Sequence, residues 1–102
     1  MYIQLAQNYR DFDKIRITEI HFYEGDDVTL KKLTFRYQVY KKDGESFIEL
    51  FNKNIYITEP NEVLSIASII PQQNDDIWKS VSRALLRYII DNNIESGTLE
   101  LE

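Results

Sequence analysis

The feature that most constrains the fold is the alternation of apolar and polar residues through the first half of the chain. Residues 14–23 carry apolar side chains at every second position, first in odd and then in even phase, as Ile15, Ile17, Ile20 and Phe22. A period of two is typical of a β-strand with one buried face. Since a β-bulge shifts this phase by one residue, the sequence predicts a strand here with a bulge near Thr18-Glu19.

Residues 28–40 show the same alternation and a similar change of phase. Val28 and Leu30 share one phase, and the other holds Leu33, Phe35, Tyr37 and Val39. The positions opposite the second set are polar or amphipathic, which indicates a second strand with one face in water. Asp43-Gly44 follows, and Asp-Gly is a strong signal for a type I′ hairpin because both central residues of that turn need a positive φ.

The third expected strand, 46–58, has apolar residues on both faces. One phase holds Ile48 and Leu50, and the other holds Phe47, Phe51, Ile55 and Ile57. We therefore expect either a central strand covered on both faces or a strand whose second face meets a partner. The polar run Asn52-Lys53-Asn54 is a candidate turn within it.

Residues 59–70 support two interpretations. Pro60 suits the first turn of a short helix that would end before Pro71. Alternatively, Pro60-Asn61 is a turn and 63–70 is a fourth strand. We favour the strand, because four of the eight residues from Val63 to Ile70 are β-branched valine or isoleucine.

Residues 75–91 form the clearest helical pattern. Asn74 is a suitable N-cap, Asp75 and Asp76 complement the positive end of a helix, and Asn92-Asn93 marks its end. One apolar stripe at helical spacing is expected to be buried: Ile77, Trp78, Val81, Ala84, Leu85, Tyr88 and Ile89.

These patterns predict an α+β fold in one domain over residues 1–102. The expected architecture is an antiparallel β-meander of three to four strands packed against one long C-terminal helix, with a short edge strand over 98–101. A chain of 102 residues is long enough for one hydrophobic core and too short for two. Leu101-Glu102 resembles a cloning-site remnant before a purification tag and carries no argument.

Composition narrows the function classes. The chain has 12 Lys and Arg against 17 Asp and Glu, a formal charge of −5, which disfavours duplex nucleic acid and anionic membranes as partners. It has no cysteine, so disulfides, thiolate catalysis and cysteine-bound metals are excluded. With neither a signal segment nor a membrane span expected, we predict an acidic cytoplasmic protein.

We expect no catalytic, cofactor-binding or metal-binding residues. His21 is the only histidine, and it lies inside a predicted strand with no nucleophile motif nearby. The carboxylate groups at Asp11 and Asp13, at Glu24 to Asp27, and at Asp75-Asp76 fit neither a calcium loop nor another recognised motif. The sequence therefore favours a protein that is not an enzyme, although a carboxylate-based enzyme or a small-ligand binder stays as an alternative.

Two groups of residues are candidate contact surfaces. Lys79, Arg83 and Arg87 recur every four residues on the helix, with Leu86 and Ile90 beside them. Exposed apolar residues next to arginines are typical of a protein interface. Equally, the N-terminal segment Tyr2-Ile3-Leu5 could cover Leu86 and Ile90 within the same chain.

The second group is the acid-free, basic stretch 28–42. Its candidate nucleic-acid contacts are Lys31, Arg36, Tyr40 and Lys42, with Arg36 and Tyr40 on the predicted water-facing side. Single-strand nucleic-acid platforms combine basic and aromatic residues in this way. Tyr37 is in phase with the buried set, which leaves one aromatic ring on that face. We therefore expect a small non-enzymatic protein that acts through protein contacts, as a homodimer or as an accessory or inhibitor subunit. Single-stranded nucleic-acid binding is the alternative.

Overall fold

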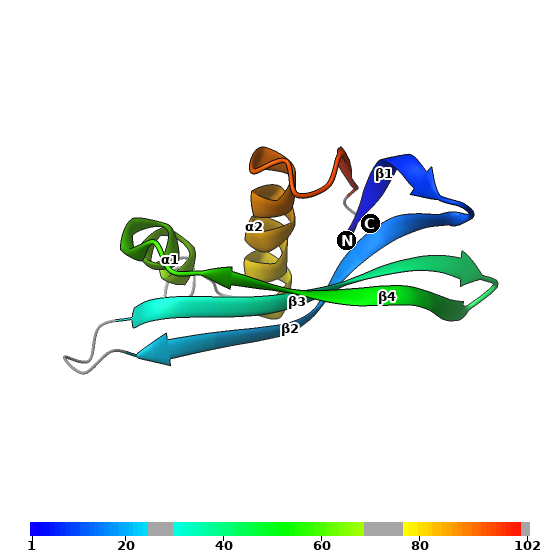
Figure 1. Cartoon of the computed structure of the whole chain (residues 1–102). Helices are drawn as coiled ribbons and strands as arrows, with labels where there is room; N and C mark the ends of the chain where they lie inside the picture. The colour runs from blue at the N-terminus through cyan, green and yellow to red at the C-terminus, as the bar shows by residue number, and fades with distance from the viewer. Residues whose placement is uncertain (25–29, 69–76, 101–102) are drawn as a thin grey trace.

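The computed structural model describes residues 1–24, 30–68 and 77–100 as a curved antiparallel sheet with two helices on the same side of it (Figure 1). None of the helices that it describes is long and apolar enough to span a bilayer. The elements, in chain order, are β1 (Tyr2–Tyr9), β2 (Phe12–Glu24), β3 (Leu30–Asp43), β4 (Ser46–Ile57), α1 (Pro60–Ala67), α2 (Ile77–Asp91) and β5 (Gly97–Glu100).

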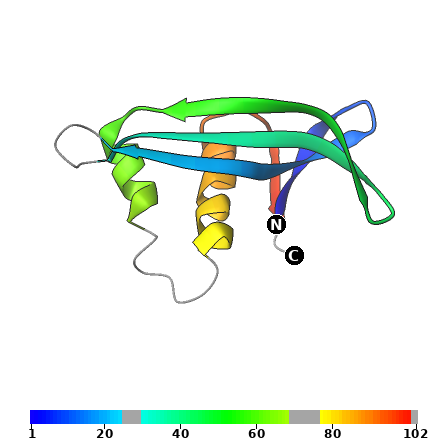
Figure 2. The same cartoon turned by 90° about the horizontal axis from the view of Figure 1, so that it is seen from below.

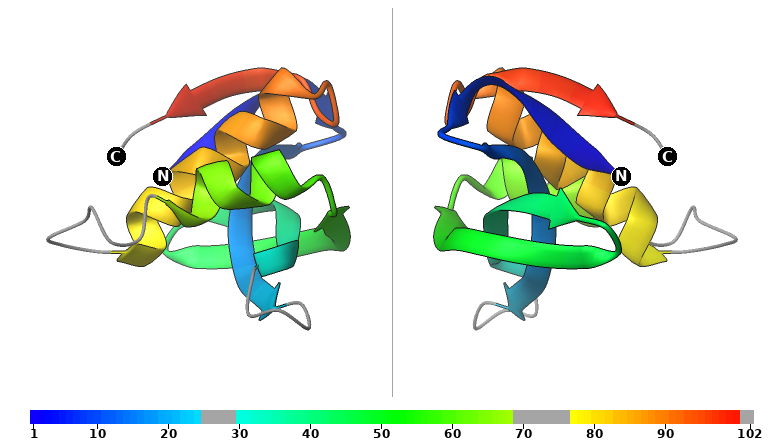
Figure 3. Two further views of the ribbon diagram at one scale, coloured as in Figure 1. Left: turned by 90° about the vertical axis from the view of Figure 1, so that its left-hand side faces the viewer. Right: turned by 90° about the vertical axis from the view of Figure 1, so that its right-hand side faces the viewer.

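The strand order is β4-β3-β2-β1-β5, and every neighbouring pair is antiparallel. The first four strands form a meander, which confirms the predicted α+β class and antiparallel sheet. The short edge strand expected over 98–101 corresponds to β5, and the sheet has five strands in all. The structure has a second helix, α1, where one long helix was expected. The N-terminal strand β1 was not predicted, and it is the strand that joins β5 to the meander. Figure 3 shows β1 and β5 curving beside α2.

The fourth strand predicted over 63–70 is wrong, because Pro60–Ala67 is the helix α1. Proline occupies the first turn, and the Glu59 side chain accepts a hydrogen bond from the backbone N–H of Asn61 at 3.1 Å. Val63 and Ile66, spaced as on one helical face, are buried. Capping and core packing therefore outweigh the β-propensity of the valine and isoleucines. Residues 69 and 70 lie outside the described part of the chain.

The two predicted changes of phase correspond to irregular pairing between β2 and β3. The register shifts between Ile17 and Glu19, which confirms the bulge near Thr18-Glu19. A second shift places Lys32 opposite Tyr23 but Leu30 opposite Glu24, so β3 has one extra residue there. Each bulge returns the next apolar residues to the helix-facing side of the sheet.

The β3–β4 hairpin is present, but its turn differs from the predicted one. Asp43 pairs with Ser46, so Gly44 and Glu45 are the two loop residues. Within the described residues, Gly44 has a positive φ of 65° and Glu45 does not. A type I′ turn needs a positive φ at both central positions. The predicted type I′ turn centred on Asp43-Gly44 is therefore wrong, although the hairpin itself is confirmed.

The core lies between the sheet and the helices. Leu33, Phe35, Tyr37 and Val39 of the central strand β3 are each at most 1% exposed. The opposing stripe on α2 is rotated toward Leu86 relative to the predicted one, and its buried residues are Val81, Ser82, Leu85, Leu86 and Ile89.

Burial of Ile77 and Trp78 was predicted wrongly. Their side chains are 46% and 47% exposed. Figure 2 shows the reason, because the first turn of α2 projects past β2 and has no sheet beneath it. The expected cap and acidic first turn, Asn74 to Asp76, lie outside the described residues. The predicted end at Asn92-Asn93 is confirmed, since Asn93 takes the left-handed conformation with φ 56°.

The connection from α2 to β5 is held tightly on both sides. Asn93 N–H donates to the Ile90 carbonyl and Ile94 N–H to the Ile89 carbonyl, at 3.1 and 3.0 Å, which is a Schellman helix end. Gly97 then pairs with Leu5. A side chain at Gly97 would collide with the Gln4 carbonyl and approach Ile3 Cγ2 to 2.7 Å.

Replacing Gly97 with alanine is expected to destabilise the protein, because strand β5 would have to move away from β1. We expect the free energy of unfolding to fall by about 1–3 kcal/mol in urea denaturation. Gly44→Asn is the matched control, since Gly44 has open space around it and asparagine tolerates a positive φ. Equal stability of the Gly97→Ala variant and the wild type would contradict the close approach.

Candidate functional site

The basic stripe of α2 does not have the apolar neighbours that the sequence suggested. Arg83 and Arg87 are exposed, as is Lys79. Leu86, however, is 1% exposed, and Ile90 packs against the same core. That core also contains Ile3 and Leu5 of β1. Of the two alternatives left open, burial of Leu86 within the same chain is the one that the structure shows.

The outer face of the sheet, on the side away from the helices, carries interleaved cations and aromatic rings. At one end Lys32 Nζ lies 5.3 Å from the Tyr23 ring centre and 5.5 Å from that of Tyr56. At the other end Arg16 Cζ lies 4.1 Å from the Phe47 ring centre. Such cation–π contacts order the polar side chains of this face without burying their charges.

Of the four residues predicted for nucleic-acid contact, Tyr40 was wrongly placed in water. Tyr40 is 3% exposed, since Arg16 and Phe47 cover its ring. Arg36 is bound by Glu19 at 3.4 Å and by Asn54 Oδ1 at 3.1 Å. Lys42 is exposed and lies over Phe47 at 5.5 Å. The side chain of Lys31 lies outside the described residues.

The rings that are exposed on the outer face were missed in the sequence. Tyr23 is 46%, Phe47 46% and Tyr56 61% exposed. Tyr56 lies in the same phase of β4 as Asn52 and Asn54, and this polar phase was the signal that could have placed Tyr56 on the outer face. Phe47 lies beyond a register shift between Val39 and Tyr40. That shift reverses its phase, so counting along the sequence assigns Phe47 to the wrong side.

Strand β4 is an edge strand. Of the two arrangements left open for 46–58, the central strand is wrong, because β4 pairs with β3 alone in the sheet. It is also one uninterrupted strand, so the candidate turn at 52–54 is absent. Ile48 and Leu50 are 37% and 43% exposed. Figure 2 shows β4 along one long side of the sheet, with no described strand beyond it.

His21 lies on the outer face beside an acid. Its Nε2 is 4.0 Å from Glu19 Oε2, and both side chains are about half exposed (56% and 47%). Its ring tilts toward Tyr23, with 6.3 Å between ring centres. Glu19 is also the partner of Arg36, so these three side chains lie together on the sheet surface.

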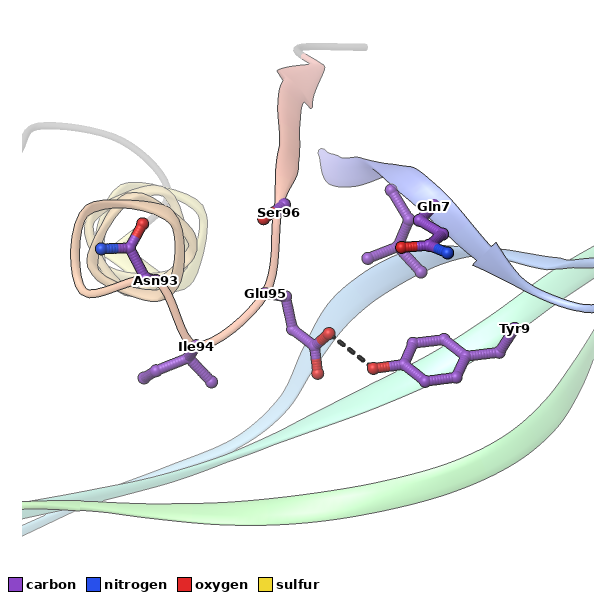
Figure 4. A pocket seen from close by; sticks show the side chains of 7 residues that line it. Gln7, Tyr9, Asn93, Ile94, Glu95 and Ser96 are labelled. Atoms are coloured by element: carbon purple, nitrogen blue, oxygen red, sulfur yellow. Dashed lines mark hydrogen bonds between the residues drawn. The ribbon is translucent and has the colours of Figure 1, made fainter.

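A group of polar side chains that was missed in the sequence surrounds Glu95 in the loop between α2 and β5 (Figure 4). Tyr9 of β1 donates its hydroxyl proton to Glu95 Oε1 at 2.7 Å, and Tyr37 of β3 donates to Oε2 at 2.9 Å. The carboxylate thus ties together three segments that are distant in sequence. Sequence spacing gives no signal for this group, because the contacts span 86 and 58 residues.

The two phenols are held in their protonated form. Burial of the Tyr37 ring, followed by the hydrogen bond and the negative charge of Glu95, raises the pKa of Tyr37 well above its ordinary value of 10.0. The hydrogen bond to Glu95, followed by partial burial, also raises the pKa of Tyr9. Both hydroxyls therefore remain donors to the carboxylate across the physiological pH range.

The raised pKa of Tyr37 predicts a loss of stability in alkali. Above about pH 10 the unfolded chain releases the phenolic proton and the folded chain retains it, so the free energy of unfolding falls as pH rises. The expected contribution is up to about 1.4 kcal/mol per pH unit. In urea denaturation between about pH 9 and pH 11, Tyr37→Phe is expected to reduce this slope.

The control for that measurement is Tyr56→Phe, because Tyr56 is 61% exposed. We expect this variant to keep the wild-type slope. An unchanged slope in Tyr37→Phe would show that Tyr37 ionises equally in the folded and unfolded chains, and would contradict the buried hydrogen bond.

Comparison with family models, with curated proteins and with solved structures finds no match to this chain.

Proposed function

We propose that this protein is a non-enzymatic binding protein of the cytoplasm that acts through protein contacts, and that two copies associate through the free edge of β4. The observation that carries the proposal is a 12-residue edge strand with apolar side chains on both faces. Its exposed Phe47 is on the outer face, and exposed Ile48 is on the other.

A free strand edge presents unpaired backbone N–H and C=O groups. Natural proteins shorten such edges or cover them, because another strand can pair with them. The opposite edge of this sheet follows that rule, since β5 has only 4 residues. Strand β4 is three times as long and has only Glu49 and Lys53 as charged residues. Pairing through β4 would extend the sheet and cover the apolar residues beside its edge.

A second copy is a suitable occupant of this edge. The whole chain carries a charge of −5, so two copies repel each other at most surfaces. Glu49 and Lys53 cancel within β4, so this edge is neutral. Two antiparallel copies of one strand are related by a two-fold axis, which is the commonest symmetry among oligomers. The β4 edge therefore brings two acidic chains together without opposing like charges.

The test is the mass of the protein in solution with and without charges at the edge. Sedimentation equilibrium is expected to give a dimer for the wild type and a monomer for the double variant Ile48→Lys, Leu50→Lys. Lysines on an edge strand prevent strand pairing. Circular dichroism is expected to show the same fold in both proteins, because both positions are substantially exposed.

Leu64→Lys is the matched control, because Leu64 is 53% exposed on α1, away from the β4 edge. This variant is expected to stay dimeric. A strictly monomeric wild type at high concentration would contradict the proposal. It would mean that Lys53 and the register shift in β4 protect the edge.

The outer face supports a second candidate function, the binding of single-stranded nucleic acid. Exposed Tyr23 and Tyr56 flank Lys32. Stacking bases on aromatic rings with a cation close to the backbone is how single strands are bound without sequence preference. This candidate ranks second, because the net charge opposes it and Glu19 already binds Arg36.

For this candidate, fluorescence anisotropy of a labelled oligothymidylate is the measurement. Binding is expected at low salt, with a steep loss between about 50 and about 200 mM salt. Tyr56→Ala and Lys32→Ala are expected to weaken it, whereas Lys53→Ala, which removes the same charge from the other face, is expected to leave it unchanged. Absence of binding at low salt removes the candidate.

A further inference from the structure

A cavity of about 420 Å³ opens beside Glu95, and no residue of β4 lines it. Two segments form its walls: β1 supplies Leu5, Gln7 and Tyr9, and the loop before β5 supplies residues 93–96. Figure 4 shows Glu95 pointing across the cavity toward Tyr9, with Gln7 above the ring. The walls are rigid, because the Schellman end of α2 holds Asn93 and Ile94, and Ala6 N–H binds the Ser96 carbonyl at 2.8 Å.

The carboxylate in this cavity has two hydrogen bonds and, within the described part of the chain, no counter-ion. Both of its partners are neutral phenols. Among the described residues, the Lys14–Asp13 and Arg36–Glu19 ion pairs do not involve Glu95, and no ion pair to Glu95 is found. Each carboxylate oxygen can accept a second hydrogen bond. The Glu95 carboxylate therefore has spare acceptor capacity in a partly enclosed space.

The other groups in the cavity define the shape of a complementary ligand. Gln7 and Asn93 contribute side-chain carbonyl oxygens, and Ser96 contributes a hydroxyl. An ammonium group has three donors and no acceptor, so a carboxylate and neutral oxygens are suitable partners for it. The ring of Tyr9 favours a cation. Leu5 and Ile94 offer apolar contact to a short alkyl chain.

We infer that the Glu95 cavity is a binding site for a primary alkylammonium group. Glu95 is the charged contact, and Gln7 is a polar contact from the opposite wall. Tyr37, which is fully buried, orients the carboxylate from below the cavity. The ammonium group belongs either to a free alkylamine or to a lysine side chain of another protein, since both present the same chemistry.

The test uses the full chain and the probe n-butylammonium, followed by amide chemical shifts. Shifts are expected for Gln7, Ile94 and Ser96, and saturation is expected in the millimolar range. Two comparison probes separate charge from shape. Tetramethylammonium has the charge without N–H donors, and n-butanol has the alkyl chain without the charge, so both are expected to bind more weakly.

Glu95→Gln is expected to weaken n-butylammonium binding by about tenfold or more, because a charge-assisted hydrogen bond becomes a neutral one. Glu62→Gln on α1 is the matched control, since it removes one acid that does not line the cavity, and it is expected to bind as the wild type does. Tyr9→Phe retains the carboxylate and is expected to retain binding, which keeps the test valid if Glu95→Gln unfolds.

Two further arms identify the source of the ammonium group. A short peptide with one central lysine is compared with the same peptide acetylated at that lysine. Tighter binding of the lysine peptide than of n-butylammonium indicates a protein lysine, and binding of n-butylammonium alone indicates a free amine. If no probe shifts the cavity amides, or if n-butanol binds as well as n-butylammonium, the site is overturned and Glu95 is only a structural anchor.

Discussion

The packing of α2 across the helix-facing side of the sheet is the interaction on which the rest of the structure depends. Leu85, Leu86 and Ile89 belong to one hydrophobic core with the buried residues of β3 and of β1, and all are essentially removed from water. Burial of that much apolar surface is the dominant favourable term in folding. The helices cover part of one face of the sheet, and the β3–β4 hairpin extends beyond them (Figure 2). Contacts with other molecules are left to the outer face, the strand edges, the uncovered end of the sheet and the loops.

The helices cover only one face of the sheet, and the two edges of the sheet differ from each other. β5 is short and packs beside α2, whereas β4 extends past the helices as a long free strand. The outer face is stabilised differently, by cations over aromatic rings and by the Glu19–Arg36 pair. These polar contacts leave β4 as the place where apolar side chains and unpaired backbone groups coincide, and that coincidence is the basis of the proposed association.

Glu95 shows how a hydrophobic core can accommodate one carboxylate at its boundary. The Tyr37 ring is fully buried, so its hydroxyl needs a partner. Glu95 provides it from a loop that the Schellman end of α2 and the pairing of Gly97 with Leu5 hold in place. The same rigid loop forms one wall of the cavity. The contact that satisfies the core therefore also directs a carboxylate toward solvent-accessible space.

The sequence by itself determined the meander of β2 to β4, the bulge at Thr18-Glu19 and the end of α2 at Asn93, because these follow from local periodicity and backbone preference. Only the tertiary structure decided that Pro60–Ala67 is a helix, that Leu86 and Tyr40 are buried, and that β4 is an edge. Burial and strand order depend on residues far apart in the chain. The Glu95 group is the extreme case, since its partners approach only after all three segments have packed.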